Sequence, residues 1–398
     1  MISLRSRTPM CSHLVLCLGA GLVVGVSVGR PLAAQVAVRV ELQVEPEFDS
    51  NVFLLSNRQR SRLTSPPAGV VTSGRYANME SATDVIVVTR GGIELVMPGV
   101  DGRDLSFYPE VRYEGNMQNA ERRNGQFGLE VKQDLPRDGR LRLDAKLTPG
   151  YFARNYLEDA TDANGDLVIS PDETSYTAGR YGAGTVELDY RHRLNKSTKS
   201  SPFGAALLIA AGYESQAYDA PFTNRDFRGP TGALAVLLQT SRRTSLDLIY
   251  DLAVFEGSPG PQVMLVDEAD AGQDLNGNGF ATDQGVRVAG RTDRGRTEHA
   301  AGIRFGSEMT RRADLRLAVE NRWRAFSSTE PNDYQNRGRR DMRTEAGADV
   351  SLRLGGGTRL LMGVRGATQR IERARATKVD EVADYNRFRA SVGIRHRF

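Results

Sequence analysis

Apolar and polar residues alternate along most of the chain after residue 35. From Val36 to Val44 every even position carries Val or Leu, and most odd positions are charged or polar. Successive side chains of a β-strand point to opposite faces of a sheet, whereas a helix would spread the same charges over all its sides. The pattern therefore predicts a strand with one apolar and one polar face.

The same alternation recurs to the end of the chain, in about fourteen segments near the ten-residue length that a tilted membrane strand needs. They begin near Val36, Val85, Asp104, Gln126, Arg140, Tyr176, Phe203, Gly232, Ser245, Thr297, Asp314, Arg343, Arg359 and Tyr385. After residue 35 no stretch approaches eighteen uninterrupted apolar residues, so we expect no transmembrane helix there. The predicted fold is all-β, a single antiparallel transmembrane β-barrel of about fourteen strands.

The connections between these segments alternate in length. Short turns are expected at 98–102, 136–139, 241–244, 310–313 and 355–357. Long polar stretches lie at 54–84, 155–175, 257–296, 327–340 and 372–384. Outer-membrane barrels have short periplasmic turns and longer extracellular loops, so the alternation favours that class over a soluble sandwich. An even number of strands leaves both termini on the periplasmic side.

Aromatic residues near the strand ends suggest two girdles, one at each membrane interface. One set lies next to the long connections: Tyr113, Tyr151, Tyr213, Phe255, Trp323 and Tyr385. The other set lies next to short turns or the chain end: Phe107, Tyr190, Phe203, Phe305 and Phe398.

The first 34 residues have the features of a cleaved signal peptide. Arg5 and Arg7 precede an apolar run at 14–28, and Ala33-Ala34 supply small residues for cleavage. We therefore expect residues 1–34 to be removed and residues 35–398 to form the barrel. Both cysteines, Cys11 and Cys17, lie in the leader, so the mature chain is expected to have no disulfide.

Composition and charge exclude few classes of protein. The mean hydropathy of −0.42 suits a soluble protein, and it equally suits a barrel whose lipid-facing and lumen-facing residues average out. The formal net charge is +4, from 53 basic and 49 acidic residues that are mixed along almost every segment. A nucleic-acid-binding surface needs clustered basic residues, so we expect no nucleic-acid partner.

Two stretches carry a resemblance to known proteins. The last predicted strand, 385–398, has apolar residues at alternate positions and ends in Phe398, which resembles the C-terminal signature of Gram-negative outer-membrane proteins. In those families the barrel assembly machinery reads this signal, so Phe398 is the implied assembly signal. The stretch 45–53, EPEFDSNVF, resembles the end of the first strand in putative β-barrel porin families. The resemblance implies an outer-membrane location and a barrel more than it implies a solute.

Two predicted extracellular loops are candidates for calcium binding. The stretch 162–173 resembles an EF-hand loop, with ligands expected from the Val168 carbonyl and from Asp162, Asn164, Asp166, Ser170 and Glu173. It departs from that pattern at Leu167, where the loop needs glycine. The second stretch offers Asp274, Asn276 and Asn278 but has Gly285 in place of the terminal Glu. Solvated turns use the same residue types, so a turn without metal stays open. No cofactor is otherwise required.

Charged residues dominate the polar faces of the predicted strands. A charge facing hydrocarbon would cost about 2–4 kcal/mol near the bilayer midplane, so these side chains are expected to face a polar lumen. Six are selected as the groups that set the lumen field: Arg112, Arg142, Asp144, Glu187, Arg322 and Arg343. Two interiors stay open, a water-filled pore or a network of cross-strand ion pairs that seals itself.

Signals of an enzyme are few. The chain after residue 34 has three histidines and none of the common nucleophile, metalloprotease or phosphate-loop motifs. His299, with Glu298 and Ser307 nearby in sequence, is the one pairing that suggests a membrane-embedded hydrolase. We therefore expect that the protein is not an enzyme.

The leading hypothesis is a porin-like channel of the cell outer membrane for passive diffusion of small polar solutes. A closed structural or surface-assembly barrel, whose extracellular loops bind a polysaccharide or a protein, is the alternative. The expected partners are outer-membrane lipid, the barrel assembly machinery and the solutes. A homo-oligomer stays open, because no interface is readable in the sequence.

Overall fold

The alternating segments form the strands of a closed antiparallel barrel. The computed structural model describes residues 36–65, 73–160, 173–195, 203–267, 285–331, 333, 335–372 and 384–398. The predicted signal peptide lies outside these residues. Within the described residues, Ala37–Phe398 forms one unit, in which fourteen strands close the barrel. The predicted fold class is therefore confirmed.

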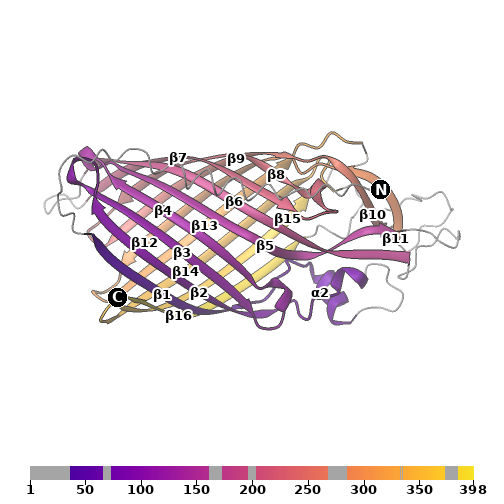
Figure 1. The fold of residues 1–398 in the computed structure, drawn as a ribbon, viewed down its shortest axis with the longest axis horizontal. Helices are drawn as coiled ribbons and strands as arrows, with labels where there is room; N and C mark the ends of the chain where they lie inside the picture. The colour runs from indigo at the N-terminus through magenta and orange to yellow at the C-terminus, as the bar shows by residue number, and fades with distance from the viewer. Residues whose placement is uncertain are drawn as a thin grey trace, which may run out of the picture. The chain divides into compact units, whose positions relative to one another are not determined.

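The barrel strands follow one another around the sheet in chain order, with the last strand paired to the first (Figure 1). Their bounds are β1 (Ala37–Asp49), β2 (Asp84–Pro98), β3 (Asp104–Asn116), β4 (Asn124–Asp134), β5 (Arg140–Ala160), β6 (Thr174–Asn195), β7 (Gly204–Tyr218), β8 (Phe227–Gln239), β9 (Thr244–Gly257), β12 (Arg296–Glu308), β13 (Ala313–Phe326), β14 (Arg340–Gly355), β15 (Thr358–Glu372) and β16 (Tyr385–Arg397).

The connection from β9 to β12 contains a hairpin that the sequence pattern did not indicate. β10 (Gly260–Asp267) and β11 (Gly285–Thr292) pair antiparallel as a separate two-stranded sheet. In Figure 1 this hairpin lies beyond the ends of most barrel strands. The Asn224 side chain donates a hydrogen bond to the Pro261 carbonyl at 2.8 Å, which ties the base of the hairpin to the β7–β8 connection.

One short helix, α2 (Asn57–Thr64), lies in the described part of the β1–β2 connection. A capping box starts it: the Gln59 amide donates to the Ser56 hydroxyl, and the Ser56 amide donates to the Gln59 side chain. None of the helices in the described ranges is long and apolar enough to cross a bilayer.

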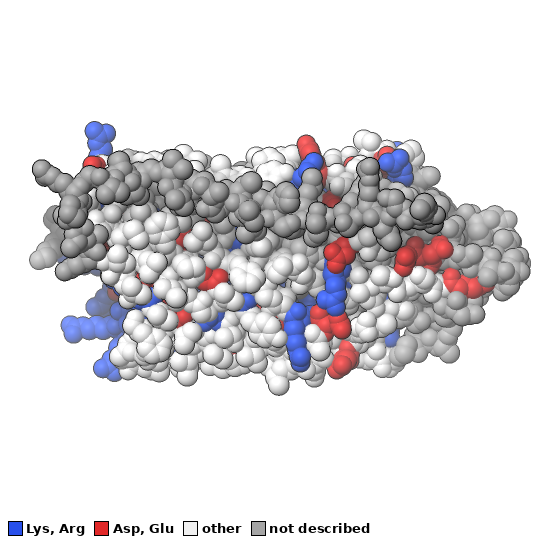
Figure 2. Space-filling view, viewed as in Figure 1, with Lys and Arg blue, Asp and Glu red and all other residues white. Residues whose placement is uncertain are grey.

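The strands place their apolar residues on the outer surface. On β1, Val38 is 60% exposed and Leu42 is 49% exposed, whereas Gln43 on the opposite face is 3% exposed. The same exposed apolar set continues around the sheet, for example at Ile209 and Val392. On the face in Figure 2, uncharged side chains cover most of the described strands, and Lys and Arg project at the end that carries the C-terminus. Such a surface suits lipid rather than water.

The prediction of two aromatic girdles is only partly correct. Tyr113, Tyr213 and Trp323 are exposed near the long connections, and Tyr190, Phe203 and Phe398 are exposed near the opposite end. Phe255 and Tyr385 are instead buried, because they share the faces of Asp251 and Arg387, which point inward. Proximity to a strand end therefore did not decide which way an aromatic ring points.

Candidate functional site

The inward faces of the strands form the candidate site. All six residues that the sequence analysis selected for the lumen line its cavities. Arg112 lies on β3, Arg142 and Asp144 on β5, Glu187 on β6, Arg322 on β13 and Arg343 on β14. Cross-strand register brings some of them side by side, with Asp144 opposite Glu187 and Arg322 opposite Arg343.

Five cavities adjoin one another inside the barrel. The largest two have volumes of about 780 and 760 Å³, and the others have volumes of about 410, 350 and 330 Å³. Neighbouring cavities share lining residues: Arg316 lines three of them, and so does Arg359. The cavities therefore follow one another along the lumen, and charged side chains of both signs line each of them.

Arg142 is surrounded by carboxylates from two neighbouring strands. Its Nε donates to Asp189, which is buried, and its Nη atoms lie 3.6 Å from Glu130 and 3.6 Å from Glu187. Lys132 joins the group through Glu130 at 2.5 Å. This part of the wall is a closed network in which acidic groups outnumber basic ones.

A second network centres on Glu298, a buried carboxylate at the start of β12. Its oxygens lie 2.6 Å from Arg296, 3.2 Å from Arg324 and 3.5 Å from Arg322. Arg322 also pairs with Glu320 at 3.0 Å. Three guanidinium groups therefore surround one buried carboxylate, and charge-assisted hydrogen bonds hold them in place.

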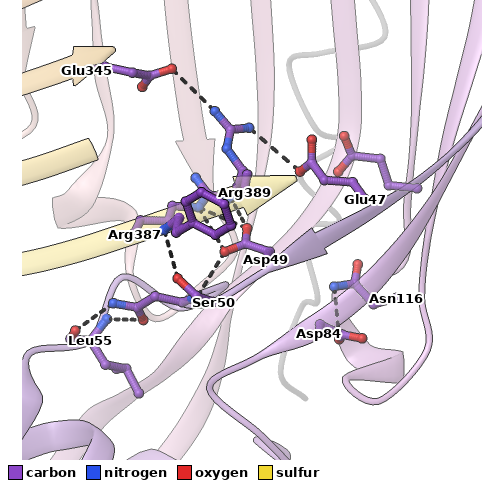
Figure 3. Close-up of polar contacts among 12 residues, drawn as sticks. Glu47, Asp49, Ser50, Leu55, Asp84, Asn116, Glu345, Arg387 and Arg389 are labelled. Carbon is purple, nitrogen blue, oxygen red and sulfur yellow. Dashed lines mark hydrogen bonds and ion pairs between the residues drawn. The ribbon is translucent and has the colours of Figure 1, made fainter. Parts of the chain in front are cut away.

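The seam where β1 meets β16 is held by ion pairs on the inner face (Figure 3). Asp49 is fully buried and accepts hydrogen bonds from the Arg387 guanidinium, one of them from Nε at 2.9 Å. Arg389 lies 3.7 Å from Glu47 and 3.3 Å from Glu345 (Figure 3). The first and last strands are therefore joined by charged side chains as well as by their backbone hydrogen bonds.

The porin-like stretch 45–53 contains the residues that build this seam. The buried Asn51 side chain donates to the carbonyls of Leu55 at 2.7 Å and Asn386 at 2.9 Å, and it accepts from the Leu55 amide at 2.8 Å. These bonds fix the turn that follows β1 and attach it to β16. The Asp and Asn of the stretch therefore have a structural role that the resemblance alone did not supply.

The β1–β2 connection covers part of the lumen wall at the extracellular end. Val52, Phe53 and Leu55 pack against Ile86 and Val88 of β2, and all five are buried. Ile86 and Val88 have the same strand parity as Arg90, and Val88 lines a lumen cavity together with Arg90. The connection therefore lies on the inner face of β2 and narrows this end of the barrel.

Arg122, in the β3–β4 connection, fastens the β1–β2 connection to β5. Its guanidinium lies 4.8 Å from the centroids of both the Phe53 and the Tyr151 ring, and it donates to the Ala153 carbonyl at 3.1 Å. Burial lowers the pKa of the Arg122 guanidinium to about 10, so it keeps its charge at neutral pH. Similar stacking occurs at Arg225, 3.6 Å from the Tyr156 ring centroid.

Most of the residues proposed as calcium ligands lie outside the described residues. Of the first candidate loop only Glu173 is described, and the ligands proposed in the second loop, Asp274, Asn276 and Asn278, lie outside the described residues. In the described part of the chain, no group of three or more His, Cys, Asp or Glu side chains could hold a metal ion. Calcium binding therefore stays a prediction.

The residues of the suggested hydrolase are not assembled into a site. His299 lies on the outer face of β12, opposite the exposed Trp323, and its Nδ1 is 2.7 Å from the Tyr250 hydroxyl. Glu298, the next residue along the strand, points inward to its arginine cluster. Adjacent strand residues face opposite sides of a sheet, so His299 and Glu298 cannot act on one substrate.

Arg90, Arg316 and Arg359 line the cavity of about 350 Å³, the central cavity. Arg90 and Arg359 carried no sequence signal of function, and Arg316 carried only its place in the arginine-rich last third of the chain. The alternation of faces along each strand could have placed these three arginines in the lumen. Which of them have carboxylate neighbours depends on register between strands, and that is decided by the barrel.

Solved structures of outer-membrane proteins are similar to this chain at low sequence identity. No known protein family and no curated protein matches the chain. The anion-selective porin from Comamonas acidovorans is 9% identical, over 92% of this chain and 100% of that one, with a TM-score of 0.37. The outer membrane channel DcaP of Acinetobacter baumannii is 8% identical, over 93% and 99%, with a TM-score of 0.40. OccAB3 of the same organism is 10% identical, over 92% and 100%, with a TM-score of 0.36.

Proposed function

We propose that the protein is a channel of the cell outer membrane through which small polar solutes diffuse passively. The observation that carries the proposal is the row of adjoining cavities inside a closed barrel, each lined by charged side chains. Charged walls keep such a lumen hydrated, and the apolar outer surface suits lipid. The six residues Arg112, Arg142, Asp144, Glu187, Arg322 and Arg343 set the field along the path and do no chemistry.

Single-channel recording in a planar lipid bilayer tests this function. We expect the purified protein to give stepwise, ohmic conductance. A matched pair of variants on β16 places the path: Ser391→Trp puts a large ring into the central cavity, and Val392→Trp puts the same ring on the outer surface. The first variant should lower the single-channel conductance and the second should leave it unchanged. Equal conductance in both variants would place the current outside this lumen.

The buried β1–β2 connection favours a second candidate, a closed barrel whose extracellular loops bind a surface partner. Phe53 and Leu55 fill space on the lumen side of β2, and ion-pair networks fill other parts of the wall. Absence of any conductance from protein that is folded in the same bilayers would favour this candidate over the channel.

A further inference from the structure

Three arginines form a row across neighbouring strands on the lumen wall. Arg359 of β15 lies directly opposite Arg353 of β14 and directly opposite Arg395 of β16. All three line the same cavity, with a volume of about 410 Å³. Like charges directly opposite each other destabilise a sheet, so the row is unfavourable for folding by itself.

The outer members of the row have carboxylate partners and the middle one does not. Arg353 lies 3.2 Å from Asp314, and Arg395 lies 3.5 Å from Glu41. Arg359 forms no ion pair with any carboxylate in the part of the chain that the structure describes. Its charge is therefore available to a negatively charged group in the lumen.

Arg316 of β13, like Arg359, has no carboxylate partner among the described residues. Its cross-strand neighbour is Asp349, but the Asp349 carboxylate pairs with Arg365 at 3.5 Å, and Arg316 makes no ion pair within the described ranges. Arg316 and Arg359 both line the large periplasmic-side cavity and the central cavity. They therefore stand at the junction through which a solute passes between the two.

Both cavities have an excess of positive charge. The periplasmic-side cavity is lined by seven arginines and by three carboxylates, which are Asp247, Glu308 and Asp314. One of these, Asp314, is already paired with Arg353. The central cavity is lined by seven arginines and by four carboxylates, and it includes a second pair of facing arginines, Arg90 and Arg112. The excess therefore extends through this part of the lumen.

We infer that this part of the lumen prefers small anions carrying carboxylate or phosphate groups, and that Arg316 and Arg359 determine this preference at the junction of the two cavities. A guanidinium group binds such anions through two parallel hydrogen bonds. An anion at the junction would also relieve the repulsion within the arginine row. This inference rests on the proposed channel function and names its solute class.

The reversal potential in a potassium chloride gradient, at low ionic strength to limit screening, measures the preference. We expect chloride to be favoured over potassium. A unit positive charge acting through water over about 5 Å raises the local concentration of a monovalent anion roughly fourfold and lowers that of a monovalent cation roughly fourfold, so Arg359→Gln should lower the chloride-to-potassium permeability ratio by up to about sixteenfold. Arg359→Lys keeps the charge and should keep the ratio.

Arg370→Gln is the matched control, because Arg370 lies on the same strand but is exposed and paired with Asp384 at the extracellular end. Arg316→Gln gives a second test should Arg359→Gln not fold. An open channel that prefers potassium, or a ratio unchanged in both glutamine variants, overturns this inference and leaves the channel function standing. Absence of any conductance overturns both.

Discussion

At the scale of single residues, buried carboxylates fix the extracellular end of the barrel. Asp84 at the start of β2 is buried and accepts five hydrogen bonds. Three come from the backbone amides of Met117, Gln118 and Asn119, and two come from the side-chain amides of Asn116 and Asn119. One side chain thus accepts from three successive backbone amides at the start of the tight connection between β3 and β4.

Replacing Asp84 should therefore cost more than its size suggests. Asp84→Ala leaves several buried amides without an acceptor, and we expect the free energy of unfolding to fall by about 3 kcal/mol. Urea unfolding of the protein in lipid vesicles measures the change. Glu80→Ala is the control, because the Glu80 side chain is exposed nearby. Equal losses for the two variants would contradict the structural role of Asp84.

At the scale of elements, the β1–β2 connection is organised by a few buried side chains. Phe53 is 2% exposed, packs edge-on against Phe152 with ring centroids 6.4 Å apart, and lies beneath the Arg122 guanidinium. The Asn51 side chain fixes the turn in which Phe53 lies, through two hydrogen bonds to the backbone of Leu55. The helix α2 follows directly, so its position depends on these anchors.

Removing the Phe53 ring should release this connection. Phe53→Ala is expected to destabilise the packing of the β1–β2 connection against the barrel by about 3–4 kcal/mol, since a large buried ring is lost. Proteolysis within α2 should then become faster, and the single-channel conductance should rise because the connection no longer narrows this end of the barrel. Met117→Ala removes an exposed apolar side chain at the same end and should change neither. Unchanged proteolysis in Phe53→Ala would show that the ring does not hold the connection.

At the scale of the whole molecule, closure of the barrel depends on β16. This strand pairs with β15 on one side and with β1 on the other, and the Phe398 amide donates to the Val40 carbonyl at 2.9 Å. The Phe398 side chain, in contrast, is 68% exposed. Its ring therefore contributes little to the packing of the finished barrel, although its backbone contributes to closure.

Because the Phe398 ring is exposed in the finished barrel, replacing it should affect assembly of the barrel and not its stability. If Phe398 is the signal for the assembly machinery, Phe398→Ala should reduce the amount of folded protein in the outer membrane of cells and change urea unfolding of the purified protein by less than about 0.5 kcal/mol. Val40→Ala is a control on the strand opposite. Normal membrane levels of Phe398→Ala would remove the proposed role of the ring.

The sequence alone determined the fold class and the fourteen barrel strands. It could do so because a strand repeats every two residues, so that the pattern carries the orientation of every side chain. The six selected residues lie on the walls of the cavities, and their role in setting the lumen field stays a prediction. The proposed calcium ligands and the signal peptide lie largely outside the described residues and stay predictions.

Only the tertiary structure decided which charges meet. Arg142 finds three carboxylates, whereas Arg359 faces two other arginines, although both lie on strands of similar alternation. It also decided that the β1–β2 connection covers the inner face of β2. These features depend on the register between strands and on contacts across the barrel, which a pattern along one segment does not encode.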